Sequence, residues 1–311
     1  MNYMINKIVA IQGNHPSKLN PTTDTSIFLA HEIQNKKYKI FYYDPKDLSI
    51  INSKVIAMGF FIKFNNTHKK FFKILKKQKL DLSNCKFILI RQDPPFNLEY
   101  ISATYILDTI KDKVKILNNP TSIRNVSEKL YSAKYQKFMP STIFTQNIDE
   151  IKNFFKTHKK VILKPIHSHG GNDIHLLTRF NLKLIQQFIK KHDHIMCQKY
   201  LAKINKGDKR VFLINGKVCG AISRVPKKGS FLSNMSKGAI PINIKLTKVE
   251  NAISKLIAKD LKKENIHFAG IDFIDQKLNG DINVTSPTGL KTLFDLSGIN
   301  LAKTFWKELK A

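Results

Sequence analysis

The chain has 311 residues, of which 42% are hydrophobic and 10% are aromatic, so it is long enough to form two or three ordinary domains. No apolar run approaches the roughly 18 residues of a membrane span, and the apolar run at the N-terminus is too short for a signal peptide. The formal net charge is +30, from 53 Lys and Arg against 23 Asp and Glu. We therefore expect a soluble, cytoplasmic, strongly basic protein without a membrane partner.

The basic residues are mostly lysines, and they are spread along every segment. No basic run alternates with aromatic residues as a base-stacking groove requires, so we expect no nucleic-acid partner, with polyanion binding as the alternative. Only five basic residues are arginines. Since Arg offers a planar fork for carboxylate or phosphate that Lys lacks, Arg91, Arg210 and Arg224 are candidate contacts for an anionic substrate. Ordinary packing is the alternative for each of them.

The first third of the chain alternates strand-like and helix-like segments, which is typical of an α/β fold. A βαβ unit is predicted first, with its helix beginning after the capping residue Asp24. The next buried strand stops at a proline pair, and ligands in such sheets gather at the carboxyl ends of strands, where Arg91 and Asp93 fall. The alternative is that the prolines only end the strand. The predicted strands are 7–13, 38–44, 87–93 and 114–120, and the predicted helices are 25–37 and 98–112.

From about residue 125 the chain favours hairpins. Lys164 lies inside the apolar run VILKP, where an unpaired ammonium would be costly, so it needs an anionic partner. The glycine pair Gly170 and Gly171 lets backbone N–H groups approach a phosphate, although a simple hairpin turn is the alternative. Later segments are predicted as a strand at 195–201, two strands around an Asn-Gly turn at 207–225, a helix at 247–265 and a last hairpin at 270–287.

The last hairpin contains oxygen-bearing side chains where a strand would normally be apolar. If Asp272 and Asp281 project from adjacent strands, with Asn283 on the same face as Asp281, three oxygen ligands converge. Such a set suits Mg²⁺ carried on substrate phosphates. Exposed turn residues are the alternative. His167, His169 and His175 lack the spacing of a closed zinc site, and we interpret them as part of a solvated loop.

Five segments together resemble prokaryotic glutathione synthetase of the ATP-grasp superfamily, over nearly the whole chain. They read IRQDPPFNLEYISATYIL, NNPTSIRNVSEKLYSAKY, VILKP with the following GG, GDKRVFLINGKVCGAISRVP, and GIDFI with INVTSPTG. The resemblance implies an α/β fold with a Rossmann-like domain at 1–124 and an ATP-grasp domain at 125–311. A lid lobe at about 125–200 and a C-terminal lobe at about 201–311 would hold ATP between them. A homo-oligomer is also implied.

The resemblance further implies a ligase that joins γ-glutamylcysteine to glycine with ATP, through an acylphosphate. It assigns Arg210 a catalytic role near the transferred phosphoryl group. Mg²⁺, with Mn²⁺ as a possible substitute, would be held by Asp272, Asp281 and Asn283. The implied ATP contacts are Lys129, Lys164, Gly170, Gly171, Gln198, Tyr200, Leu201 and Asp208, and the implied substrate contacts are Arg91, Arg224 and Asn234.

The chain also departs from the family pattern at four places, one of them the segment HSHGGND, where the family tends to have Asp-Gly before the glycine pair. Asp281 stands where the family usually has Glu, segment 229–238 lacks an arginine that the family carries, and Leu290, Lys291 and Thr292 replace a segment with isoleucine, arginine and acidic residues. Two alternatives therefore stay open. One is a diverged ATP-grasp ligase with another acyl and amine pair, and the other is a non-catalytic binding protein with this fold.

Overall fold

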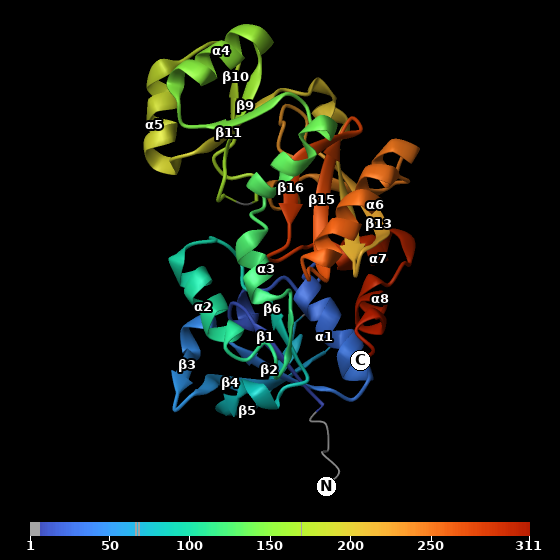
Figure 1. Cartoon of the computed structure of the whole chain (residues 1–311). Helices are drawn as coiled ribbons and strands as arrows, with labels where there is room; N and C mark the ends of the chain where they lie inside the picture. Colours follow the sequence, from blue (N-terminus) through green and yellow to red (C-terminus); the bar gives the residue numbers. More distant parts are fainter. Residues whose placement is uncertain (1–6, 66, 68, 169) are drawn as a thin grey trace.

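Three β-sheets follow one another along the chain, each built from one continuous stretch of sequence. The structure is a computed structural model, and it describes all residues except 1–6, 66, 68 and 169. In Figure 1 the N-terminal sheet lies at the bottom, a small sheet with two helices lies at the upper left, and the C-terminal sheet lies at the upper right. The predicted α/β class is confirmed.

The N-terminal sheet has a parallel centre and an antiparallel extension. Its order is β3-β4-β2-β1-β6-β7, with β5 pairing β4, and the parallel pairs are β1 with β2, β1 with β6 and β6 with β7. The sequence predicted the parallel strands, whereas the long antiparallel hairpin β4–β5 was not predicted. The elements are β1 (Ile8–Gln12), α1 (Thr25–Asn35), β2 (Lys39–Tyr43), β3 (Leu48–Ile51), β4 (Lys54–Phe64), β5 (Phe72–Asp81), β6 (Phe87–Ile90), α2 (Leu98–Asp108), β7 (Lys115–Leu117) and α3 (Pro120–Asn125).

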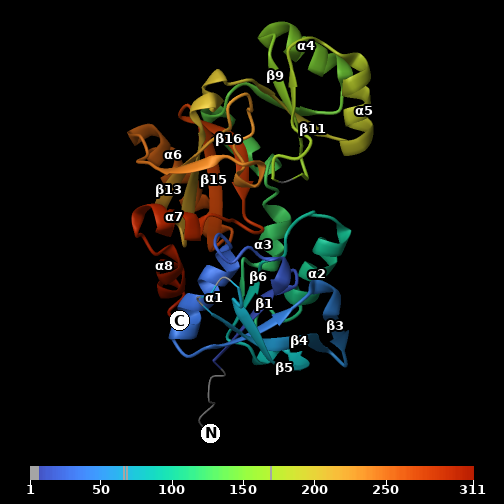
Figure 2. The ribbon, with the colours of Figure 1, turned by 180° about the vertical axis from the view of Figure 1, so that it is seen from behind.

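The small sheet is antiparallel in the order β10-β9-β11-β8, and two amphipathic helices cover one of its faces. Ile151 and Phe188 from the helices pack against Leu163 and Cys197 from the strands. Figure 2 shows both helices on the side away from the rest of the molecule. The elements are β8 (Thr142–Thr145), α4 (Ile148–His158), β9 (Val161–Pro165), β10 (His175–Leu177), α5 (Leu182–His192) and β11 (Ile195–Lys199).

The C-terminal sheet is antiparallel in the order β14-β13-β12-β15-β16. The predicted Asn-Gly turn joins β12 to β13, with both residues in the left-handed region at φ 47° for Asn215 and 78° for Gly216. Helix α6 packs on one face, while α7 and α8 lie on the other. The elements are β12 (Asp208–Ile214), β13 (Lys217–Val225), β14 (Ile240–Asn243), α6 (Lys248–Lys263), β15 (Phe268–Ile274), β16 (Lys277–Asn283), α7 (Leu290–Ser297) and α8 (Leu301–Glu308).

The N-terminal and C-terminal sheets share one hydrophobic core. Helix α8 returns to lie beside α1 (Figure 2), and the indole N–H of the fully buried Trp306 donates to the carbonyl of Leu29 at 2.9 Å. Asn118, just after β7, adds a polar connection. Its side-chain amide nitrogen donates to the carbonyls of Phe268 and Val284 at 2.7 and 2.6 Å. Its side-chain oxygen accepts from the backbone N–H groups of His267 and Phe268, each at 2.9 Å.

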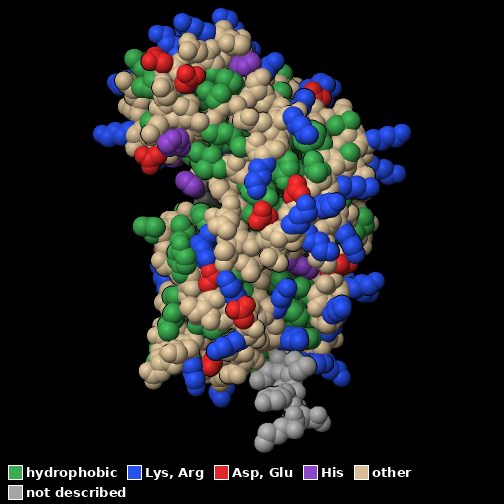
Figure 3. Space-filling view, viewed as in Figure 1, with side chains coloured by type: hydrophobic (Ala, Val, Ile, Leu, Met, Phe, Trp, Pro, Cys, Tyr) green, Lys and Arg blue, Asp and Glu red, His purple; other side chains and the backbone are tan. Residues whose placement is uncertain are grey.

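On the face that Figure 3 shows, Lys and Arg side chains are spread over the upper and lower parts, with Asp and Glu side chains and hydrophobic areas between them. This distribution agrees with the diffuse lysine content of the sequence. Among the helices of the described residues, none has both the length and the apolar character needed to span a membrane.

We expect Asn118→Ala to lower the free energy of unfolding by at least about 3 kcal/mol, because four buried backbone groups lose their partner at once. Urea unfolding followed by circular dichroism measures the change. Asn119→Ala is the matched control, since Asn119 only caps α3 and its loss should cost about 1 kcal/mol. Equal losses in the two variants would contradict the role of Asn118 as the connection between the sheets.

Candidate active site

One pocket contains nearly all of the site residues predicted from the sequence. Its walls come from β9 and β11 of the small sheet and from β12, β13, β15 and β16 of the C-terminal sheet. The geometry thus brings together side chains that lie up to about half the chain apart in sequence. The predicted residues that line it are Lys129, Lys164, Gly170, Gly171, Gln198, Tyr200, Leu201, Asp208, Arg210, Arg224, Asn234, Asp272, Asp281 and Asn283.

Asp272 is held by two arginines from neighbouring strands. Arg210 is its cross-strand partner, and its Nε and Nη2 donate to the two carboxylate oxygens at 2.5 and 2.8 Å. Arg224 Nη2 donates to Asp272 Oδ2 at 2.8 Å, and its Nε donates to Asp208 at 2.8 Å. Burial would raise the pKa of Asp272, but the two guanidinium groups outweigh burial and hold that pKa at about 2. The carboxylate is therefore ionised at neutral pH.

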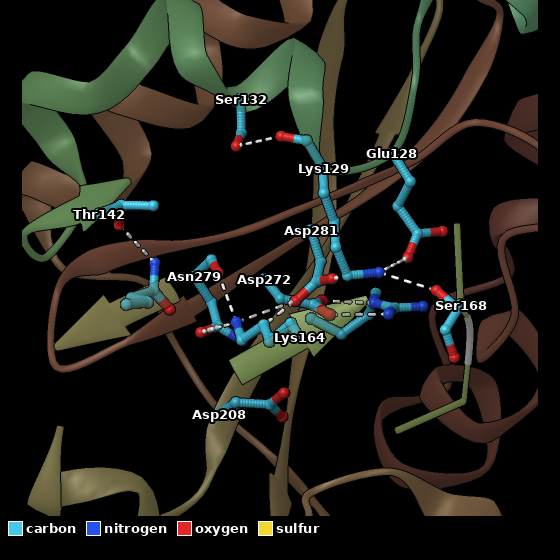
Figure 4. A network of polar contacts seen from close by, with 12 residues as sticks. Glu128, Lys129, Ser132, Thr142, Lys164, Ser168, Asp208, Asp272, Asn279 and Asp281 are labelled. Carbon is cyan, nitrogen blue, oxygen red and sulfur yellow. Dashed lines mark hydrogen bonds and ion pairs between the residues drawn. The ribbon is translucent and has the colours of Figure 1, made fainter. Parts of the chain in front are cut away.

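Asp281 lies between two lysines from other parts of the chain (Figure 4). Lys129 Nζ is 3.5 Å from one of its oxygens, and Lys164 Nζ is 3.7 Å from the other. Burial disfavours both ammonium groups. Glu128 and Asp281 overcome this effect and raise the pKa of Lys129, whereas burial prevails over Asp281 and lowers the pKa of Lys164. The anionic partner expected for Lys164 is thus the carboxylate of Asp281 in β16.

A bulge in β16 brings Asp281 to this position. The ladder pairs Ile271 with Ile282 and Phe273 with Leu278, so three residues of β16 stand opposite Asp272. Gly280, inside the bulge, has φ 88°, and a Cβ there would overlap with the Met196 side chain of β11. The positive φ favours glycine at this position, because other residues rarely adopt it.

Residues at the end of β11 and directly after it also line the pocket. Gln198 donates to the Thr142 hydroxyl at 3.0 Å, which fixes the end of β11, and Tyr200 and Leu201 follow directly. Sequence reasoning identified these three residues through the resemblance alone. Sequence reasoning missed several apolar side chains that also line the pocket, because nothing in a linear pattern distinguishes them from core residues. They are Ile162, Ile174, Ile204, Phe231, Leu232 and Ile274.

The glycine pair lies in the loop that joins β9 to β10, so the hairpin alternative and the pocket role are compatible. Gly170 and Gly171 have φ 64° and 75°, and a Cβ on Gly171 would overlap with the Asn234 side chain. This contact brings the loop of the small sheet against the 226–238 loop of the C-terminal sheet. His169 lies outside the described residues.

The residues present fit a magnesium ion bound together with phosphates. The donors Asp272, Asp281 and Asn283 are all oxygens and all line the pocket. Among the described residues, no group of three or more His, Cys, Asp or Glu side chains is placed to hold a metal ion alone. The pocket wall carries five cationic side chains and four carboxylates, so it is close to neutral. A divalent ion that arrives with a polyphosphate keeps that balance better than the polyphosphate alone.

Arg91 lies outside this pocket. It is buried at the end of β6, where its Nε donates to the Ser26 hydroxyl and its Nη1 donates to the Pro287 carbonyl, both at 3.0 Å. It therefore ties the N-terminal sheet to the loop that follows β16. Burial lowers the pKa of Arg91, although Asp24 and Asp93 oppose that effect.

We predict that Asp272→Asn lowers the free energy of unfolding at pH 7. The difference in this free energy between the variant and the unchanged chain should become smaller in acid. The folded pKa of Asp272 is about 2 and the ordinary value is 3.8, so the pairing stabilises the fold above about pH 4 and is lost as the pH falls towards 2. This difference in pKa corresponds to roughly 2 kcal/mol. Urea unfolding at pH 7, 4 and 2.5 measures it, and a constant difference across these pH values would contradict it.

Comparison with known proteins gives the same picture for the whole chain. The family described as "Prokaryotic glutathione synthetase, N-terminal domain" matches residues 8–124, and "Prokaryotic glutathione synthetase, ATP-grasp domain" matches residues 128–298. The glutathione synthetase of Agrobacterium fabrum is 33% identical over 310 residues, covering 98% of this chain and 96% of that one. The glutathione synthetase of Buchnera aphidicola subsp. Baizongia pistaciae is 36% identical over 293 residues, covering 92% and 90%.

Solved structures support the fold. D-cycloserine synthetase DcsG superposes with a TM-score of 0.65 at 10% identity, covering 97% of this chain and 99% of that one. The ATP-grasp ligase PsnB, complexed with a minimal precursor, gives a TM-score of 0.64 at 12% identity and covers 97% of both chains. At such identities the likeness concerns the fold alone. The two family matches and the full-length relatives show that this chain belongs to the prokaryotic glutathione synthetase family.

Proposed function

We propose that this chain is an ATP-dependent ligase that makes glutathione from γ-glutamylcysteine and glycine, releasing ADP and phosphate. The observation that carries the proposal is the charge arrangement of the pocket. Lys129 and Lys164 pair with Asp281, and Arg210 pairs with Asp272, in a pocket that also has apolar lining residues. This arrangement suits a magnesium nucleotide, and the relatives of similar length are named glutathione synthetases.

The first chemical step brings two anions together, because the acyl substrate's carboxylate attacks the γ-phosphate of ATP. The guanidinium of Arg210 and the ammonium groups of Lys129 and Lys164 would offset this repulsion and stabilise charge on the transferring phosphoryl group. A bound Mg²⁺ or Mn²⁺ would supply further neutralisation of phosphate charge. The residues that would hold it are Asp272, Asp281 and Asn283.

The second step forms the peptide bond. The glycine amine attacks the acyl carbon of the acylphosphate, the bond from that carbon to the phosphate oxygen breaks, and the amine loses a proton. Water would compete with the amine for the acylphosphate, so the pocket must be covered during this step. The loop with Gly170 and Gly171 and the loop with Asn234 already touch above the pocket, which suits them for that role.

We assign the acyl substrate to a smaller cavity beside the nucleotide pocket. The two share Glu128 and Ser168, so they are neighbours. The smaller cavity has an apolar wall formed by Pro94, Phe96, Ile123, Val126 and Ile166, which suits a small thiol-bearing side chain. For polar contacts with the two non-nucleotide substrates we propose Arg224 and Asn234, which line the nucleotide pocket, whereas Arg91, expected in this role from the sequence, lines neither cavity and is bonded to Ser26 and Pro287.

We propose the division of the chain at residues 124 and 125, with the substrate domain before it and the ATP-grasp domain after it. The N-terminal sheet lies entirely within 1–124, and the small and C-terminal sheets lie within 125–200 and 201–311, as a lid lobe and a catalytic lobe would. By analogy with the family we also propose a cytoplasmic homo-oligomer with small-molecule substrates and without a nucleic-acid partner.

One observation favours a second candidate, a ligase of this family with another acyl or amine substrate. Segments 229–238 and 289–292, which differ from the family pattern, contact each other, because the Thr292 hydroxyl lies 3.9 Å from Met235 Sδ. Two altered segments in contact are what a changed substrate site would require. The nucleotide pocket is common to both candidates.

ADP release by the purified chain, measured by a coupled assay, separates the candidates. We expect release that depends on both γ-glutamylcysteine and glycine, and we expect Lys164→Ala to reduce kcat/KM at least about 100-fold, because a buried charge contact with phosphate is lost. Lys190→Ala, on the outer end of α5, is the control and should leave the rate unchanged. Release only with other carboxylates would favour the second candidate, and no release with any carboxylate would contradict both.

Phe96→Ala tests the cavity assigned to the acyl substrate. Losing about 100 Å² of apolar contact should raise the KM for γ-glutamylcysteine by about tenfold or more, while the KM for ATP stays within about twofold. Initial rates with each substrate varied in turn give both constants. Equal changes in the two constants, or a change in the ATP constant alone, would show that this wall does not hold the acyl substrate.

A further inference from the structure

Asn279 belongs to the bulge of β16, and neither its sequence context nor the family resemblance pointed to it. Together with the following Gly280 it forms an Asn-Gly pair of the kind that usually makes a hairpin turn. The turn of this hairpin is instead at Asp275 and Gln276, whose φ values are 47° and 62°. The Asn-Gly pair does not form the turn but lies in the bulge opposite Asp272, and Asn279 lines the pocket.

Asn279 contacts both the buried Lys164 and Asp281 of the same strand. Lys164 Nζ donates to the Asn279 side-chain oxygen and to its backbone carbonyl, each at 2.9 Å. The Asn279 amide nitrogen donates to Asp281 Oδ2 at 3.2 Å. Figure 4 shows the three side chains together at the centre of the network. Since Lys164 Nζ is 3.7 Å from Asp281, the amide makes the shorter contact with each charged group.

We propose that Asn279 is a positioning residue that holds Lys164 and Asp281 at the spacing a magnesium polyphosphate requires. The proposal rests on the proposed function only in that the nucleotide is bound with a divalent ion. Lys164 comes from β9 of the small sheet and Asp281 from β16 of the C-terminal sheet, so the amide fixes one lobe against the other at the phosphate site.

The neutral amide is the group that can do this. Its oxygen accepts from the ammonium and its nitrogen donates to the carboxylate, whereas a carboxylate at this position could only accept and would stand beside a second anion. A leucine could do neither and would leave the buried ammonium with the backbone carbonyl and the longer contact to Asp281. The side chain thus matches one positive and one negative neighbour without adding charge.

The same bulge contains Asp281, whose side chain is one methylene shorter than that of glutamate. Three residues of β16 stand opposite Asp272 there, and Gly280 among them lies next to the Met196 side chain. Asn279 then orients the shortened carboxylate from two residues away.

Calorimetric titration of the full chain with ADP, with and without Mg²⁺, tests the proposal without any acyl or amine substrate. We expect Asn279→Ala to weaken Mg–ADP binding about tenfold or more, because a hydrogen bond to each of two charged groups is lost. We expect Asn279→Asp to weaken metal-free ADP binding more than Mg–ADP binding, since the ion offsets the added negative charge. The Mg²⁺ concentration for half-maximal tightening should rise in Asn279→Ala.

Asn153→Ala, exposed on α4, is the matched control and should bind as the unchanged chain does. Thermal unfolding of each variant separates positioning from folding, and Asn279→Asp keeps the size of the side chain if Asn279→Ala fails to fold. Unchanged or tighter ADP binding in both variants would overturn the proposal. If the unchanged chain binds Mg–ADP but does not make glutathione, the proposed function is wrong. The role of Asn279 is then still tested by these titrations alone.

Discussion

The structure depends on the pairing of buried cations with carboxylates, both within the C-terminal sheet and between that sheet and the small sheet. Lys129, Lys164, Arg210 and Arg224 are each at most 7% exposed, and an unpaired buried charge destabilises a fold by several kcal/mol. Each of the four therefore has to meet an acidic or carbonyl oxygen. That requirement fixes the register of β12 against β13 and β15, because the partners Asp208 and Asp272 lie directly opposite the arginines or next to them.

The same pairing explains how the pocket can accept a ligand with both signs of charge. With carboxylates already holding the cations in place, the pocket wall is preorganised and nearly neutral before any nucleotide enters. Phosphate oxygens can then share the ammonium and guanidinium groups, while a divalent ion shares the carboxylates. An ion and a polyphosphate that arrive together change the balance least, which is the physical reason to expect a magnesium nucleotide.

The departures from the family pattern fall into two groups with different consequences. At position 281 the shorter side chain accompanies a bulge that presents the carboxylate to Lys129 and Lys164, so the nucleotide end keeps its charge arrangement. Segments 229–238 and 289–292 lie against each other on the side of the C-terminal sheet that carries α7. Phe231 and Leu232 of the first of these segments line the same pocket as Lys129 and Lys164, so one altered segment forms part of the pocket wall itself.

Much of this protein could be read from the sequence by itself. Strand and helix periodicity, the cap at Asp24 and the Asn-Gly turn at 215 and 216 predicted the parallel centre of the first sheet and the hairpins of the last one, because these signals act over a few residues. Lys164 was predicted because a charge inside an apolar strand needs a partner, whereas Lys129 and Asp208 were predicted from the family resemblance alone. Only the tertiary structure decided which partner each one has, as Lys164 with Asn279 and Asp281 shows. It also decided that Arg91 ties two domains outside the pocket and that Phe231 lines it, since burial against a distant strand leaves no mark in a local pattern.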